Sequence, residues 1–206
     1  EGTAPVLDSG TRRGMGTQAV ALGEAVGYTS AGSVEFIVDQ DRNFYFLEMN
    51  TRLQVEHPVT EAITGIDIVR EQMQVAASQP LEHTQADINF TGHAVECRIN
   101  AEDPDTFLPS PGTITQYHQP GGPGIRVDSH IYNNYTVPPY YDSMIAKVIA
   151  HGENRTQALT RMSGALEEMV IDGIKTNIPL QQRLVTDSAF GRQPMDIHYL
   201  ERNRRS

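Results

Sequence analysis

Polar and apolar side chains alternate along the segment that follows Phe44-Tyr45-Phe46-Leu47, a run of strand-forming residues. The polar positions are Glu48, Asn50, Arg52, Gln54 and Glu56, and Met49, Leu53 and Val55 between them are apolar. An extended backbone would place all five polar groups on one side. Phe44 and Phe46 stand at even-numbered positions, as the five polar residues do, so the pattern predicts a face that carries aromatic rings as well as polar groups. A solvated strand face is the ordinary alternative.

This polar segment is too long to serve one small substrate as a single strand. Its polar positions from Glu48 to Glu56 would span about 26 Å at roughly 3.3 Å per residue. We therefore expect the strand to end near Asn50 and the remainder to fold back as a loop, which Pro58 helps to fix.

A partner strand is predicted just upstream, at Ser33-Val34-Glu35-Phe36-Ile37-Val38. The polar turn at 39–42 would join the two strands as a hairpin and bring Glu35 near Glu48. Together with the amide of Asn50, these carboxylates form an all-oxygen set, which suits Mg²⁺ or Mn²⁺ and not zinc. The pattern indicates a site for a metal and a nucleotide, and a pair of mildly repelling surface carboxylates is the alternative.

Helices are predicted on both sides of this hairpin. Between Thr11 and Val26 apolar residues recur at helical spacing, and a second helix follows the loop. Their predicted apolar faces are Met15, Ala19, Leu22 and Val26 in the first, and Ile66, Val69, Met73 and Ala76 in the second. The polar segment from Gln79 to Thr91 has no clear period, so we place a domain boundary there.

The second half of the chain begins with an alternating strand around Cys97 that points Arg98 away from its apolar face. Further on, an apolar run from Met144 to Ala150 predicts a strand that is covered on both faces. A helix from Arg155 to Val170 follows, with Asn154 as its cap and Ala158, Met162, Ala165 and Met169 as its core stripe. A last helix begins at Asn177, with Pro179 in its first turn. The glycine-rich stretch at 121–124 predicts a turn, because no helix follows it to bind a phosphate.

Composition narrows the class of partner. The chain has 206 residues and a formal net charge of −10, which argues against a nucleic-acid or anionic-membrane partner. Most of its cations are Arg, whose side chain matches planar anions such as bicarbonate. The single cysteine, Cys97, excludes an internal disulfide framework and fits the cytoplasm. No apolar run is long enough to cross a bilayer.

Several motifs resemble the carboxyl-terminal half of biotin carboxylase, an enzyme of the ATP-grasp family. They are Glu35 with Glu-Met-Asn-Thr-Arg-Leu-Gln-Val-Glu-His-Pro at 48–58, Gly-His-Ala-Val-Glu-Cys-Arg-Ile-Asn-Ala-Glu-Asp-Pro at 92–104, Phe-Leu-Pro-Ser-Pro-Gly at 107–112, Tyr-Tyr-Asp-Ser-Met at 140–144 and Asp-Gly-Ile-Lys-Thr-Asn at 172–177. The resemblance implies an α+β fold, with the end of an ATP-grasp domain at 1–80 and the biotin carboxylase carboxyl-terminal domain at 92–200.

The resemblance also implies a reaction. Biotin carboxylase uses ATP to activate bicarbonate as carboxyphosphate, and then carboxylates biotin on a carrier protein. This reaction is the first step of acetyl-CoA carboxylation and fatty acid synthesis, and a carboxyltransferase component follows. By resemblance, Glu35, Glu48 and Asn50 hold Mg²⁺, Ile37 and Ile197 line the adenine pocket, Arg52, Gln54 and the Val55 amide bind bicarbonate, Glu56 is the base, and Arg98 stabilises the biotin enolate.

Parts of the family's pattern are missing from this sequence. The amino-terminal domain and the glycine-rich lid have no counterpart, so we expect a fragment that is inactive alone and needs the amino-terminal half. Arg126 and Asp142 match the family's dimer contact, but Pro123 stands where a Phe can occur, which leaves a homodimer open. Another ATP-grasp ligase and a non-catalytic assembly module are the alternatives, and the former would not need Arg98.

Overall fold

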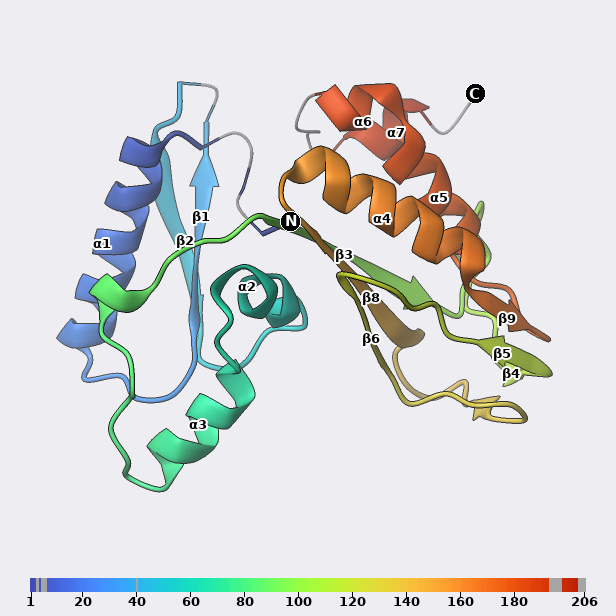
Figure 1. Cartoon of the computed structure of the whole chain (residues 1–206), viewed down its shortest axis with the longest axis horizontal. Coiled ribbons are helices and arrows are strands. Elements are labelled where there is room, and N and C mark those ends of the chain that lie inside the picture. The colour runs from blue at the N-terminus through green and yellow to red at the C-terminus, as the bar shows by residue number, and fades with distance from the viewer. Residues whose placement is uncertain (3, 5–6, 40, 193–197, 204–206) are drawn as a thin grey trace. The chain divides into compact units, whose positions relative to one another are not determined.

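The computed structural model describes residues 1, 2, 4, 7–39, 41–192 and 198–203, which form two compact units (Figure 1). The amino-terminal unit ends at Thr91, and the carboxyl-terminal unit begins at Gly92 and includes Glu1 and Gly2. This division lies at the end of the segment in which the sequence predicts a boundary. The first unit extends past Pro80, because the amide of Thr91 donates to the carbonyl of Ile63 at 2.8 Å.

The described part of the amino-terminal unit consists of a hairpin and several helices. Its elements are α1 (Ser9–Ala25), β1 (Ser33–Val38), β2 (Phe44–Asn50), α2 (His57–Thr64), α3 (Ile68–Ala76) and the short 3₁₀ helix η1 (Gln85–Asp87). Strand β2 ends at Asn50 and a loop follows it, as the sequence predicts. Pro58 stands in the first turn of α2, where its missing N–H leaves no bond unmade.

The hairpin contains a β-bulge that corrects one prediction. Glu35 pairs with Glu48, but the next residue, Phe36, pairs with Phe46, so Leu47 is an extra residue on β2. Because paired residues share a face, Phe46 belongs with Phe36 and not with Glu48. Ring contacts of Phe36 with Phe44 and Phe46, at 5.5 and 6.5 Å between centroids, confirm this aromatic face. The prediction that Phe44 and Phe46 share a face with Glu48 is therefore wrong, and Ile37 and Tyr45 lie on that face instead.

Helix α1 packs against this aromatic face. A side chain at Gly14 would place its Cβ 3.3 Å from the ring of Phe44, so glycine lets the helix approach the hairpin closely. The side chain of Asp8 caps α1 by accepting from the amides of Gly10 and Thr11, at 2.9 and 2.8 Å. None of the described residues of α1 is fully buried, so the predicted stripe is only partly covered.

The predicted apolar stripe of α3 is only partly covered, and no residue of the helix is fully buried. Ile66 and Val69 of the stripe are partly buried, whereas Met73 is 67% exposed. Ile66 also lines, with Val75 and residues of the 81–88 segment, a cavity of about 470 Å³. The helix begins one residue after Asp67, whose side chain accepts from the amide of Arg70 at 2.9 Å. Asp67 is thus the N-cap of α3.

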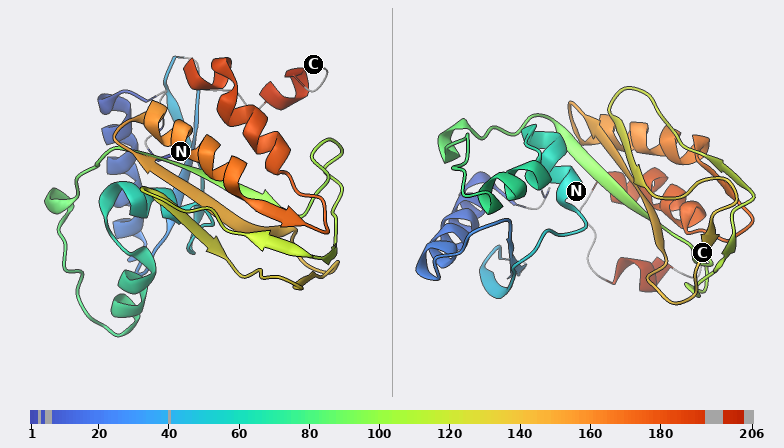
Figure 2. Two further views of the ribbon diagram at one scale, coloured as in Figure 1. Left: turned by 45° about the vertical axis from the view of Figure 1, so that its right-hand side comes forward. Right: turned by 90° about the horizontal axis from the view of Figure 1, so that it is seen from below.

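The carboxyl-terminal unit is built on a three-stranded antiparallel sheet in the order β3–β8–β6, with helix α4 packed on it (Figures 1 and 2). Its elements are β3 (His93–Asn100), β4 (Gly112–Thr113), β5 (Gln116–His118), β6 (Ile125–Ser129), β7 (Thr136–Val137), β8 (Met144–Gly152), α4 (Arg155–Glu168), β9 (Val170–Asp172), α5 (Ile178–Thr186), α6 (Ser188–Arg192) and α7 (Tyr199–Asn203). Strands β4 and β7 pair, as do β5 and β9. The predicted α+β fold is confirmed.

A large apolar core lies between this sheet and α4. The predicted stripe on α4 is confirmed, since Ala158, Met162, Ala165 and Met169 are all buried, and Asn154 caps the helix by accepting from the amide of Gln157. Cys97 is buried in the same core. Burial raises the pKa of its thiol to about 12, and the charge of Glu96 adds to the rise. Cys97 is therefore a packing residue, as predicted, and not a nucleophile.

The start of helix α5 is fastened to the end of β3. Asn177, which caps α5, is buried, and its Oδ1 accepts from the amide of Asn100 at 2.9 Å. Its Nδ2 donates to the carbonyl of Arg98 at 3.0 Å, and its own amide donates to the carbonyl of Asn100 at 3.1 Å. Through these bonds Asn177 extends the hydrogen bonding of the sheet at the end of β3, beside Arg98.

Candidate functional site

Four predicted site residues lie in one hydrogen-bonded cluster on the polar face of the hairpin. The Nδ2 group of Asn50 donates to Oε1 of Glu35 at 2.8 Å and to Oε1 of Glu48 at 3.1 Å. The side chain of Gln54 also donates to Oε1 of Glu35, at 2.7 Å. The bulge at Leu47 is what brings Glu48 onto this face, opposite Glu35.

This cluster fits a hard divalent cation. Two carboxylates face each other across neighbouring strands, and the N–H groups of Asn50 place a partial positive charge between them, while its Oδ1 accepts from Arg52. All the available ligand atoms are oxygens, as Mg²⁺ prefers. Among the described residues no group of three or more His, Cys, Asp and Glu is placed to hold a metal ion. Two carboxylates and one amide are too few ligands for an all-protein cage, so the set suits a cation that is shared with phosphates.

Arg52 lies at the start of the loop after β2 and is exposed. Its guanidinium donates to Oδ1 of Asn50 at 3.4 Å and to the carbonyl of Leu53 at 3.3 Å. It therefore adjoins the carboxylate cluster through Asn50. Both contacts are long for hydrogen bonds, so the guanidinium keeps donors for a planar anion.

Ile37 and Ile197 are the two residues assigned to an adenine pocket. Ile37 pairs with Tyr45 on the hairpin face that carries Glu35, and it is 55% exposed. An apolar side chain beside the carboxylate cluster suits a nucleotide base. Ile197 lies outside the residues that the structure describes.

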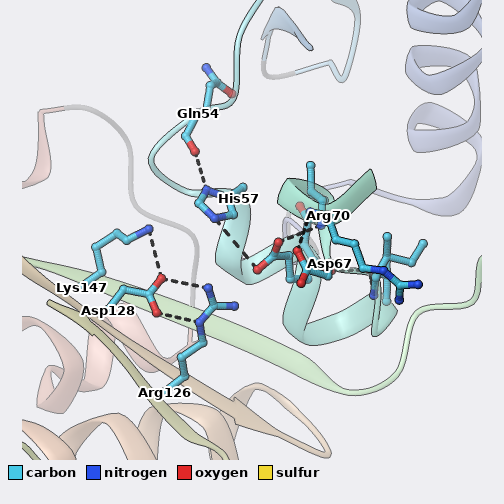
Figure 3. A network of polar contacts seen from close by, with 12 residues as sticks. Gln54, His57, Asp67, Arg70, Arg126, Asp128 and Lys147 are labelled. Carbon is cyan, nitrogen blue, oxygen red and sulfur yellow. Dashed lines mark hydrogen bonds and ion pairs between the residues drawn. The ribbon is translucent and has the colours of Figure 1, made fainter. Parts of the chain in front are cut away.

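The loop after β2 is held by His57, a residue that the sequence analysis does not single out. Nδ1 of His57 lies 2.8 Å from the carbonyl oxygen of Gln54, and its Nε2 lies 4.0 Å from Oε2 of Glu61 (Figure 3). The side chains of His57 and Glu61 are 14% and 9% exposed. Its place in the Gln-Val-Glu-His-Pro motif, directly after Glu56, was the signal in the sequence.

Arg98 lies on β3, in the carboxyl-terminal unit, and its side chain is exposed as predicted, whereas its neighbours Cys97 and Ile99 are buried. Its carbonyl accepts from the side chains of Asn177 and Gln181, at 3.0 and 3.3 Å. The backbone that carries the guanidinium is thus fixed from α5. From Val95 to Asn100 buried residues alternate with partly or fully exposed ones as predicted, and no bulge lies before Ile99, but Ala94 is buried as well.

Lys147 and Arg126 carry no part of the candidate site. Nζ of Lys147 lies 3.4 Å from Asp128, and Arg126 binds the same carboxylate through two nitrogens at 2.8 and 2.9 Å (Figure 3). Burial opposes ionisation of Asp128, but the hydrogen bond and charge of Arg126 outweigh it and hold its pKa below the ordinary value. Lys147 lies on β8, the central strand of the sheet, and its side chain is 12% exposed.

Comparisons with known proteins place this geometry in a family. The model for the biotin carboxylase C-terminal domain matches residues 96–202, and the model for the ATP-binding domain of the carbamoyl-phosphate synthase L chain matches residues 1–84. A curated biotin carboxylase from Allochromatium vinosum is 54% identical over 202 residues, which are 98% of this chain and 45% of that protein. The chain therefore spans about half the length of the curated relatives that it matches.

Solved structures agree with these matches. A biotin carboxylase from Campylobacter jejuni, solved as a β,γ-ATP complex, is 46% identical with a TM-score of 0.94, over 97% of this chain and 45% of that one. The biotin carboxylase domain dimer of the Hydrogenobacter thermophilus 2-oxoglutarate carboxylase, solved with MgADP, ADP and bicarbonate, is 48% identical with a TM-score of 0.94, over 97% of this chain and 44% of that one. The fold and the sequence motifs both match these proteins over nearly the whole chain, and the chain belongs to the biotin carboxylase family.

Proposed function

We propose that this chain supplies the carboxyl-terminal half of a biotin carboxylase active site. In the proposed reaction, ATP phosphorylates bicarbonate to carboxyphosphate, and the carboxyl group then passes to biotin on a carrier protein. The observation that carries the proposal is the cluster of Glu35, Glu48, Asn50 and Gln54 on one hairpin face, with Arg52 in contact. Membership of the family and the ligands of its solved relatives support it.

Glu35, Glu48 and Asn50 are the proposed ligands of Mg²⁺ or Mn²⁺. When bound, the cation would neutralise the charge of the ATP phosphates, which phosphoryl transfer requires. The two carboxylates keep their mutual position because their strands pair and because Asn50 and Gln54 bond to them. Ile37 would lie against the adenine. These residues bind and orient the nucleotide, and perform no covalent step.

Bicarbonate would bind beside this cluster. Arg52 offers a planar fork to a planar anion, and the side chain of Gln54 and the backbone N–H of Val55 add neutral donors. Glu56, the next residue, is the proposed base that takes the proton from bicarbonate, which makes its oxygen a better nucleophile toward the terminal phosphate. Glu56 is exposed and ends the loop at the start of α2, so its carboxylate is accessible to a substrate.

Arg98 would act in the second step. Carboxylation of the biotin ureido nitrogen develops negative charge on the ureido oxygen, and a fixed guanidinium stabilises that charge. The proposed partners are therefore a biotin carboxyl carrier protein, a carboxyltransferase component and the amino-terminal half of the enzyme, with a homodimer as a further association. No described helix is long and apolar enough to cross a membrane. The single buried Cys97 suits action in a reducing compartment such as the cytoplasm.

The test joins this chain to the amino-terminal half of the Allochromatium vinosum relative. We expect bicarbonate-dependent ATP hydrolysis, stimulated by free biotin, from the fusion and not from this chain or that half alone. Phosphoryl transfer needs a closed site that surrounds the triphosphate, so neither half suffices. The matched control is the fusion with Arg52→Ala. A folded fusion that hydrolyses no ATP in response to bicarbonate would overturn the proposed function.

A further inference from the structure

His57 bonds twice to one peptide group of the proposed bicarbonate loop. Its backbone amide donates to the carbonyl oxygen of Gln54 at 3.3 Å, and its ring Nδ1 lies 2.8 Å from the same oxygen. The shorter of the two contacts is the one made by the side chain. The oxygen of Gln54 is therefore held from one side by a single residue (Figure 3).

The chemistry of this contact fixes the state of the imidazole. A backbone carbonyl oxygen can only accept a hydrogen bond, so Nδ1 of His57 must carry a hydrogen. The other ring nitrogen, Nε2, faces Oε2 of Glu61 at 4.0 Å. Oε1 of Glu61 accepts in turn from the amide of Ile68, the first residue of α3, at 2.9 Å. The ring is thus placed between a loop carbonyl and a nearly buried carboxylate that is itself anchored.

The geometry of the peptide bond carries this restraint to the substrate side. The carbonyl of Gln54 and the N–H of Val55 belong to one planar trans peptide, so they point in opposite directions. Fixing the carbonyl toward His57 therefore fixes the N–H of Val55 away from it. A hydrogen bond to the carbonyl also polarises the peptide and strengthens its N–H as a donor.

From these contacts we propose that His57 is a positioning residue, which aims the backbone N–H of Val55 at bicarbonate by holding the Gln54 carbonyl, with Glu61 holding the ring. This inference rests on the proposed function of the loop. It predicts a defect in bicarbonate binding that leaves nucleotide binding intact, because the carboxylate cluster is bonded through Asn50 and the Gln54 side chain and not through His57.

The experiment uses two variants of the fusion that differ in where they place a donor. In His57→Asn the amide nitrogen stands as far from Cβ as Nδ1 does, whereas in His57→Gln it stands one bond further out, near the place of Nε2. We expect His57→Gln to raise the KM for bicarbonate by about 10- to 100-fold, the worth of one or two polar contacts. His57→Asn should stay within about threefold of the parent, and the KM for ATP should move by less than about threefold in both variants.

Two results would overturn the inference. One is an equal rise of both KM values in His57→Gln, since that would reflect general damage at the start of α2. The other is an imidazole whose Nδ1 carries no hydrogen, read by ¹⁵N NMR on this chain by itself. The NMR measurement needs no turnover, so it decides on the hydrogen bond even if the parent fusion lacks bicarbonate-dependent activity and the proposed function fails.

Discussion

The two units of this chain differ sharply in what holds them together. The continuous apolar core of buried side chains lies wholly in the carboxyl-terminal unit, between Val95 and Val185. In the amino-terminal unit the described residues that are fully buried are Pro58, Val59 and Ile63. Nevertheless the amino-terminal unit carries every candidate site residue in the described chain except Arg98.

This difference separates stability from chemistry. Buried apolar area is the main source of folding free energy, so the carboxyl-terminal unit has its own source of stability. The amino-terminal unit depends more on caps, paired strands and side-chain hydrogen bonds, each of which contributes only about 1 kcal/mol. Its apolar side chains at Ile37, Tyr45, Phe46 and Leu47 are more than half exposed. We therefore expect mutations in the amino-terminal unit to lower the reaction rate more than the stability, and mutations in the carboxyl-terminal unit to lower the stability more than the rate.

The largest effect on rate should come from the amino-terminal unit. Glu56→Gln in the fusion should lower turnover by about 10²- to 10⁴-fold, the usual contribution of a positioned base. Because Glu56 is exposed and caps no helix amide with its side chain, the thermal midpoint should hardly change. Steady-state kinetics and a thermal melt on one preparation check both statements. A near-normal rate would remove Glu56 from the mechanism.

The largest effect on stability should come from the carboxyl-terminal unit, and two identical substitutions compare the units directly. Leu166→Ala on α4 removes a side chain with 0% exposure and should cost roughly 3–5 kcal/mol. Leu22→Ala on α1 removes a half-buried one and should cost about 1 kcal/mol. Hydrogen exchange of β8 and β1 amides in this chain reads each unit separately. Equal costs would show that burial does not distinguish the units.

A smaller effect is expected where α5 meets β3. Asn177→Ala removes an acceptor from the amide of Asn100 and a donor from the carbonyl of Arg98, and should cost about 1–3 kcal/mol. Asn177→Asp keeps the acceptor but turns a carboxylate oxygen toward the carbonyl of Arg98, so it should cost at least as much as Asn177→Ala at pH 7. The measurement is urea denaturation of this chain. An Asn177→Ala variant as stable as the parent would show that the two bonds contribute nothing.

The smallest effect concerns pH. A hydrogen bond from Lys175 at 2.6 Å, with help from the amides of Thr106 and Asp105, holds the pKa of Asp103 well below its ordinary value of 3.8. A depressed folded-state pKa stabilises the fold above the unfolded value, and that contribution is lost as the pH falls below it. Asp103→Asn should therefore be less stable than the parent at pH 7 and equal to it at the acid end. A gap that widens in acid would contradict this sign.

Prediction from sequence succeeded where the cause of a structure is local. The cap at Asn154, the core stripe through Met162 and the end of β2 at Asn50 follow from neighbouring residues, and the structure has all three. The nearness of Glu35 and Glu48 also followed, because a short polar turn joins their strands, whereas their direct pairing depends on the bulge.

Prediction failed where the cause lies across the fold. The faces of β2 depend on how it pairs with β1, and nothing in the residue Leu47 marks it as the extra one. The cover of α3 depends on the 81–88 segment, which lines a cavity together with Ile66 and Val75 and leaves Met73 exposed. In the candidate site, the carboxylates and Arg52 could be found from the sequence motif. The proposed role of His57 could be inferred only from the direction of the Gln54 carbonyl in the structure.

The β-bulge has a consequence for how this hairpin can change over evolutionary time. Substitution at Leu47 leaves the number of residues unaltered, so Glu48 still faces Glu35. Deletion of Leu47, or insertion of one residue beside it, would change the phase of the strand and turn either the carboxylate or the aromatic rings to the wrong side. Sequences descended from this hairpin should therefore vary in the identity of residue 47 but keep the number of residues in β2 constant. A length change between Phe46 and Glu48 would mark a hairpin that has lost the proposed cation site.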